Sequence, residues 1–201
     1  WKGEELGRWL DIHSKLYDSK LLHGMEIANG PDYYPTAHRW CLEKGLTMVG
    51  NSDIHAPDLL QKNTSADHRT ITLVFATEKS EQGIHEALRA GRTAVWCGTL
   101  MIGKPEWLTA LAEAIVEIDP PHLRSKTSVW VKVRNKSAMD LVLKRTGQFG
   151  PADVTLKANS TAIFRVNVPD ASQPIPLEYQ ITNFLAAPGE GLNLSYTIPS
   201  P

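Results

Sequence analysis

The spacing of apolar residues changes near residue 119. Before that point, apolar residues recur at steps of three and four, as on one face of a helix, and these stretches alternate with short apolar runs. Beyond it, apolar and polar residues alternate almost throughout, as in strands that bury one face. The change predicts an α/β region over residues 1–118, ending in an exit helix, and an all-β region over residues 119–201.

The first region alternates predicted helices and strands, which favours parallel βα units. Pro35 in the first turn and Gly45 as the stop mark one helix, and Ser80 as the cap and Gly91 as the stop mark another. The second of these helices is expected to turn Ile84, Ala87 and Leu88 toward the core. We expect helices at 4–22, 35–44, 81–90 and 105–118, and strands at 25–27, 46–50, 70–75 and 93–96.

The second region contains at least five short strands separated by turn-forming runs such as 146–151 and 169–176. Such spacing predicts an immunoglobulin-like antiparallel β-sandwich. The residues expected to face its core are Val129, Val131, Val133, Leu141, Leu143, Phe164, Val166, Val168, Leu177, Tyr179, Ile181, Leu192, Leu194, Tyr196 and Ile198.

Composition and charge narrow the classes of function. The 201 residues are 42% hydrophobic and 21% charged with a formal net charge of −1, which excludes wholesale disorder and gives no electrostatic case for nucleic acid or an anionic membrane. No apolar run is long enough to span a bilayer. Cys41 and Cys97 are either buried thiols or one bridge. No signal peptide is visible, so cytoplasmic and periplasmic or secreted locations both stay open.

The strongest chemical signal is the segment Gly50-Asn51-Ser52-Asp53-Ile54-His55-Ala56-Pro57. Asp53 and His55 follow a predicted strand at its carboxyl end, where both side chains can reach the mouth of a barrel. A carboxylate and an imidazole suit Zn, Mn or Fe. The alternative interpretation is that Asp53 starts a turn and His55 is simply exposed.

Three segments together resemble the C-terminal part of a PHP domain, the polymerase and histidinol phosphatase family of metal-dependent phosphoesterases. They are Gly24–Gly30 (GMEIANG), Trp40–Leu46 (WCLEKGL) and Gly50–His55 (GNSDIH), and the run from Thr72 to Thr93 resembles the closing strands and helix of the family. The second half resembles a small β-sandwich appended to some bacterial PHP proteins.

The resemblance implies the C-terminal half of a distorted TIM-like barrel of seven βα units, with up to three metal ions at its carboxyl mouth. Asp53 and His55 match the last metal-binding motif of the family, and Glu26 matches a carboxylate at an earlier strand end.

Three further residues are candidates for lining the site. Asn29 and Asn51 adjoin the strand-end motifs, where they could hydrogen-bond the ligands. Arg69 could clamp a phosphate or be a solvated loop cation.

The sequence departs from the family pattern in one large respect. It contains neither the His-x-His motif nor the His-Pro ligand of the family, and two ligands do not make a catalytic metal site. We therefore expect an upstream barrel segment of roughly a hundred residues, removed from this chain or supplied as a separate one.

Two functions of different class follow. The resemblance implies a hydrolase in which metal-activated water cleaves a small phosphomonoester or phosphodiester, with this chain supplying part of the site. In the alternative, the half-barrel is catalytically empty and the β-sandwich binds a protein or a glycan, with Trp130 as a possible stacking platform. A His-x-His motif in the upstream segment would favour the hydrolase.

Overall fold

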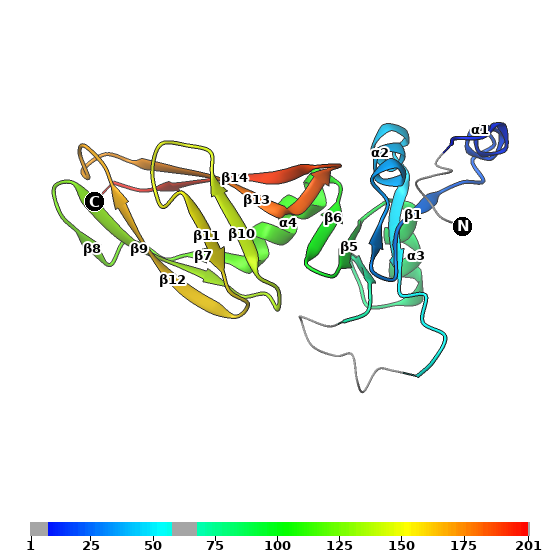
Figure 1. Ribbon diagram of the computed structural model, residues 1–201, viewed down its shortest axis with the longest axis horizontal. Helices are drawn as coiled ribbons and strands as arrows, with labels where there is room; N and C mark the ends of the chain where they lie inside the picture. Colours follow the sequence, from blue (N-terminus) through cyan, green and yellow to red (C-terminus); the bar gives the residue numbers. More distant parts are fainter. Residues whose placement is uncertain (1–7, 58–67, 201) are drawn as a thin grey trace. The chain divides into compact units, whose positions relative to one another are not determined.

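The computed structural model describes residues 8–57 and 68–200 (Figure 1). The chain divides into two compact units. The first extends to Leu108 and includes Leu185–Glu190, and the second comprises Thr109–Phe184 and the residues from Gly191 on.

A parallel strand pair joined by a helix opens the first unit. Strand β1 (Gly24–Asn29) pairs in parallel with β3 (Thr47–Asn51), and the short β2 (Asp32–Tyr33) lies antiparallel to β1. Helix α2 (Pro35–Lys44) connects them and ends at Gly45, whose φ of 67° suits glycine. The proline at the start and the glycine at the end confirm the predicted bounds of this helix.

The first helix is shorter than the sequence predicts. Helix α1 covers Asp11–Asp18, whereas the periodicity indicated residues 4–22, of which 4–7 lie outside the described residues. The backbone leaves the helix after Asp18 and takes a left-handed φ of 56° at Lys20, which ends the helical hydrogen bonding. Leu10, Ile12 and Leu16 are exposed, so only part of the apolar pattern is used for packing.

The other strands of the first unit are antiparallel, so the prediction of parallel βα units throughout is wrong. Strands β4 (Ile71–Val74), β5 (Thr93–Cys97) and β6 (Leu100–Gly103) form an antiparallel ladder, with helix α3 (Glu81–Arg89) between β4 and β5. The Phe75 amide donates to the Arg92 carbonyl (3.0 Å), so α3 lies in the loop that connects the two antiparallel strands β4 and β5. Periodicity reports the type of an element but not its direction.

Two details of this ladder also differ from expectation. Strand β6 was not predicted, although Gly98, with φ 55°, makes the two-residue turn that joins it to β5. The hydroxyl of Ser80 caps α3 by accepting from the Gly83 amide (3.0 Å), as predicted. Ile84, however, is exposed rather than turned toward the core.

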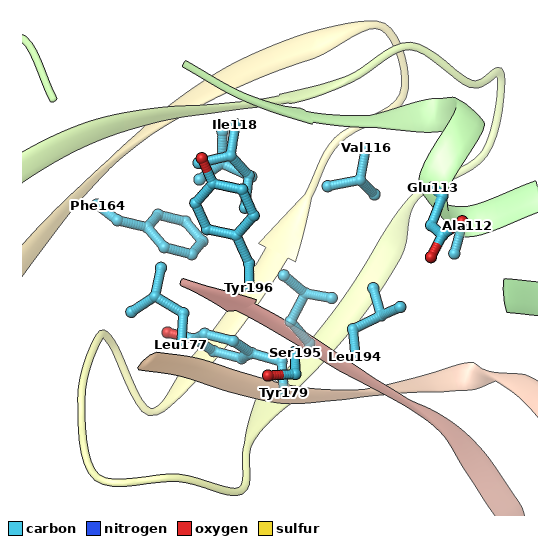
Figure 2. Close-up of a pocket in the computed structure, with 12 residues that line it drawn as sticks. Ala112, Glu113, Val116, Ile118, Phe164, Leu177, Tyr179, Leu194, Ser195 and Tyr196 are labelled. Atoms are coloured by element: carbon cyan, nitrogen blue, oxygen red, sulfur yellow. The ribbon is translucent and has the colours of Figure 1, made fainter. Parts of the chain in front are cut away.

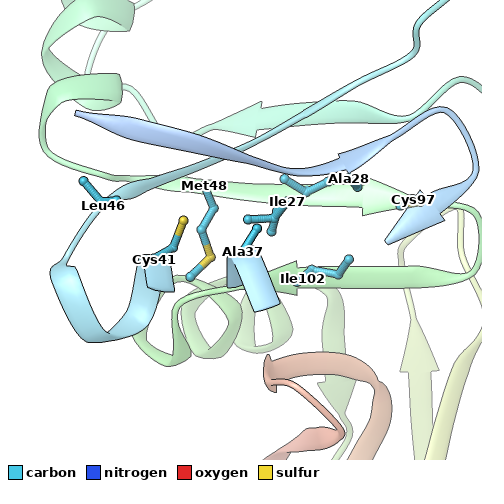
Figure 3. Packing of buried hydrophobic residues seen from close by; sticks show 9 residues of the cluster. Ile27, Ala28, Ala37, Cys41, Leu46, Met48, Cys97 and Ile102 are labelled. Atoms are coloured by element: carbon cyan, nitrogen blue, oxygen red, sulfur yellow. The ribbon is translucent and has the colours of Figure 1, made fainter. Parts of the chain in front are cut away.

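The core of the first unit lies where α2 meets the strands (Figure 3). Cys41 and Cys97 are both buried free thiols, which decides against a bridge between them. Burial raises the pKa of the Cys41 thiol to about 12, so it stays protonated and acts as a small apolar side chain. The cluster consists of Ile27, Ala28, Ala37, Cys41, Leu46, Met48, Val95, Cys97 and Ile102.

Helix α4 (Pro105–Ile115) is followed directly by a strand, where the sequence predicted helix up to residue 118. Strand β7 (Val116–Ile118) pairs with β9 (Ser128–Asn135), because its β-branched residues at 116 and 118 both face the sandwich core at a spacing of two.

Two sheets build the second unit. Strand β9 lies between β7 and β12 (Ser160–Asn167) and also pairs with β8 (Leu123–Arg124). In the second sheet, β10 (Leu141–Arg145) lies between β11 (Asp153–Leu156) and β13 (Ile175–Ala187), which pairs with β14 (Glu190–Ile198). The alternating residues of β9, β10, β12 and β13 are buried as predicted. Strands β7, β8 and β11 were not predicted.

In the described part of the chain, no helix has the length and apolar character that crossing a membrane requires.

Candidate metal-binding site

The carboxyl ends of β1 and β3 meet at one edge of the first unit. Asn29 and Asn51 are register partners in this parallel pair, and the Gly30 amide donates to the Asn51 carbonyl (2.9 Å). Because parallel strands end at the same edge, the residues that follow them are brought together there. This is the arrangement from which the sequence predicted a site.

Glu26 is the centre of a fixed polar cluster at this edge. The amide of Asn51 donates to Oε1 of Glu26 (2.6 Å), and the amide of Asn29 donates to Oε2 (3.2 Å). Both carboxylate oxygens are thereby oriented, and each keeps a further lone pair for a cation or another donor. The structure thus brings together three of the predicted site residues.

Asp53 and His55 lie in the segment after β3 and are exposed. Asp53 adopts a φ of 51°, a left-handed conformation that Asp tolerates better than most residues. Within residues 8–57 and 68–200, no three His, Cys, Asp or Glu side chains are placed to share a metal ion. Asp53 and His55 are ligands of the right chemistry for Zn, Mn or Fe, but the described residues add no third to them.

Tyr34 is a residue of this edge that the sequence reasoning missed. Burial raises the pKa of its hydroxyl, and the negative charges of Asp32, Glu26 and Asp53 raise it further. The same charges that keep the phenol protonated would favour a bound cation. The only available signal was its place three residues after the turn-forming Asn29-Gly30-Pro31 and directly before the helix that begins at Pro35.

Arg69 lies against the segment that carries His55. Its Nη2 donates to the carbonyl of Ala56 (3.4 Å), and its own carbonyl lies 2.6 Å from Nδ1 of His68. The ring of His68 packs on Trp96 with centroids 4.1 Å apart. The guanidinium is therefore near the predicted motif, where it contacts the backbone.

One solved structure is similar to the chain along most of its length. The chain is similar to a two-domain protein from Bacteroides vulgatus ATCC 8482 that contains a predicted PHP-like metal-dependent phosphoesterase, with 36% identity and a TM-score of 0.88. The match covers 94% of this chain but 57% of that protein. This chain thus spans little more than half the length of its structural neighbour.

The second unit matches a family profile. Residues 116–197 match a family described as an Ig-like domain, which begins at the first residue of β7. No protein of curated function matches the chain. Together, the comparisons and the structure show a mostly β chain that contains an Ig-like domain and is similar to a two-domain, PHP-like protein.

Proposed function

We propose that this chain forms part of a PHP-like metal-dependent phosphoesterase that hydrolyses a small phosphomonoester or phosphodiester. The observation that carries the proposal is the cluster in which Asn29 and Asn51, register partners at the carboxyl ends of β1 and β3, both donate to Glu26, with Asp53 two residues beyond the end of β3. The similarity to a protein that contains a predicted PHP-like phosphoesterase supports it. We also propose that residues 1–118 form the C-terminal half of a PHP-like barrel and that residues 119–201 form the sandwich domain.

Each residue has a role that follows from its environment. Asp53 and His55 would bind a divalent Zn, Mn or Fe ion, which when bound polarises a phosphoryl oxygen and lowers the pKa of a water molecule. Glu26, held by its two amide donors, would add negative charge beside that ion. Tyr34 keeps its proton and can donate it as a hydrogen bond to a phosphoryl oxygen.

The remaining ligands would come from a barrel segment outside these 201 residues. Catalytic metal sites use about three protein ligands and keep open positions, whereas the described residues offer Asp53 and His55. Arg69, within reach of the same segment through Ala56, is the candidate for contacting the substrate phosphate.

The test replaces the two proposed ligands in the protein as its gene encodes it. Asp53→Asn and His55→Ala should each lower metal affinity by more than the roughly 10–100-fold of a change to a residue that only supports a ligand, and should abolish hydrolysis of p-nitrophenyl phosphate esters. Asp53→Asn keeps a residue that accepts a left-handed φ. Elemental analysis and the ester assay are the measurements.

Two exposed residues provide matched controls, Asp18→Asn at the end of α1 and His85→Ala on α3. Both controls should keep metal and turnover. Full metal content and full turnover in both site variants would contradict the proposal. If the protein binds no metal, the alternative of a binding module is favoured instead. In that alternative, Trp130 has only one ring face for stacking on a ligand, because the Arg165 guanidinium lies over the other, 5.3 Å from the ring centroid.

A further inference from the structure

The second unit, which contains the Ig-like domain and is called the Ig-like unit, has an apolar cavity of about 140 Å³ between its two sheets (Figure 2). Side chains of β7, β9 and β12 line it from one sheet, those of β10, β13 and β14 from the other, and α4 closes one end. Its lining includes Glu113, Val116, Phe164, Leu177, Tyr179, Leu194 and Tyr196.

The cavity exists because the inner face of β14 is only partly covered. Leu192 and Ile198 are buried, as the period-two pattern predicts for this face. Between them, Leu194 is half-buried and Tyr196 is 36% exposed, although both have the same orientation along the strand. On the opposite sheet, Val116 of β7 is also half-buried. The partial exposure of these residues marks the mouth of the cavity.

The walls favour an apolar, flat group. The rings of Phe164 and Tyr179 lie 6.0 Å apart at an angle of 49°, and both side chains are otherwise buried. The hydroxyl of Tyr179 is already used, since it donates to the Pro151 carbonyl (2.9 Å), so this residue presents its ring. A volume of this size is sufficient for a ring such as benzene.

One end of the cavity is charged. Glu113, on the exposed side of α4, is the only charged residue among the twelve that line it, and Figure 2 shows its carboxylate beside Ala112 at one end. The ion pairs of the described residues involve other acidic groups and leave Glu113 without a cation. A ligand with a positive charge next to its apolar group would complement both features.

We propose that this cavity binds a small amphiphilic cation, with an aromatic or similarly sized apolar group between the sheets and an ammonium group against Glu113. The site lies wholly within the Ig-like unit, so it is independent of the phosphoesterase proposal.

Benzylamine is the probe, titrated into the full chain while the methyl signals of Val116, Leu177 and Leu194 are followed by NMR. Those signals should shift and saturate, and toluene and phenylacetate should bind more weakly. Glu113→Gln should weaken benzylamine binding roughly two- to fivefold, as expected for a partly exposed ion pair, and leave toluene unchanged. Glu106→Gln, exposed on the first turn of the same helix, is the matched control and should change neither.

Filling the cavity tests the location. Val116→Phe and, separately, Leu194→Phe place an added ring at the mouth, and each should abolish the binding of both benzylamine and toluene. A thermal melt by circular dichroism identifies which variants remain folded. If one of the two variants does not fold, the other still tests the location of the site. Absence of methyl shifts at about 10 mM benzylamine overturns the proposal. Equal binding of phenylacetate, or an unchanged affinity in Glu113→Gln, overturns the cationic ligand.

Discussion

His38 is a polar residue whose side chain is buried away from water. It lies on α2 with no exposed surface, and its Nδ1 is 2.7 Å from the Tyr33 hydroxyl. Its Nε2 has no hydrogen-bond partner among the described residues. Burial lowers the pKa of the imidazole to about 4, so the ring is neutral in the folded state.

This burial predicts acid sensitivity of the first unit. The unfolded chain binds a proton on His38 below its ordinary pKa of 6.5, whereas the folded chain binds it only near pH 4. The contribution of neutral, buried His38 to the free energy of unfolding is therefore fully present above pH 6.5. It is lost as the pH falls toward 4, by about 3 kcal/mol in all. Urea unfolding at a series of pH values measures the slope.

The control for this prediction is the exposed His85 on α3. His38→Gln should flatten the dependence of the free energy of unfolding on pH between 6.5 and 4, whereas His85→Gln should leave the slope of the unmodified chain. An identical slope in the His38 variant would show that other groups cause the acid sensitivity.

At the same scale, the sequence predicted which residues meet but not how they bind. Glu26, Asn29 and Asn51 were named as candidates for lining a site, and hydrogen bonds join their side chains. Their role in a site stays a prediction. Tyr34 was missed because a tyrosine before a helix carries no pattern of its own. The ligand role of Asp53 stays a prediction, since the described residues leave it exposed.

At the scale of elements, threonine hydroxyl groups of β4 and β5 form hydrogen bonds with the backbone of β3. Among the described residues, β3 belongs to a different hydrogen-bonded sheet from β4 and β5, and threonine side chains connect these strands. Thr72 bonds both the amide and the carbonyl of Gly50 (2.8 and 2.9 Å), and Thr93 donates to the Met48 carbonyl (2.7 Å). Short apolar runs rich in β-branched residues predicted these strands, but the role of their threonines depends on neighbours that are distant in sequence.

Gly50 permits this close approach, and its substitution should be costly. A Cβ added there would lie 2.3 Å from Cγ1 of Val95 and 3.1 Å from Cγ2 of Thr70, in a region where Val95 is fully buried. Gly50→Ala should lower the free energy of unfolding by about 1–3 kcal/mol through overpacking. Denaturant unfolding measures it, and the Val95→Ala background removes the clashing methyl groups, so the alanine should cost clearly less there. An equal cost in both backgrounds would argue against a steric cause.

For the whole molecule, the change of period near residue 119 predicted an α/β region and an all-β region, and residues 116–118, predicted as the end of a helix, are a strand. The predicted exit helix was extended to residue 118 because Ile115 and Ile118 continue a spacing of three. Val116 and Ile118 equally fit a strand, and three residues are too few for periodicity to decide. Pairing with β9, which only tertiary structure supplies, makes them β7.

The last prediction concerns the independence of the Ig-like unit. Residues 109–201 expressed alone should give a strand-dominated circular dichroism spectrum and melt cooperatively, because strands β7 to β14 and the side chains that they bury lie in this stretch. Residues 119–201 should be less stable. They lack β7, which covers one edge of β9 from Val133 to Asn135, and they lose the half-buried side chains of Val116 and Ile118.

Burial of these two side chains accounts for a difference of about 2–4 kcal/mol, measured as the gap between the two denaturant unfolding curves. The ion pair of Arg134 with Glu117 is exposed and should add little to it. Equal stability of the two pieces would mean that β7 adds nothing to the sandwich. A piece 109–201 without cooperative unfolding would mean that the Ig-like unit depends on the rest of the chain, because its own sheets would then bury too little apolar surface to offset the entropy of folding.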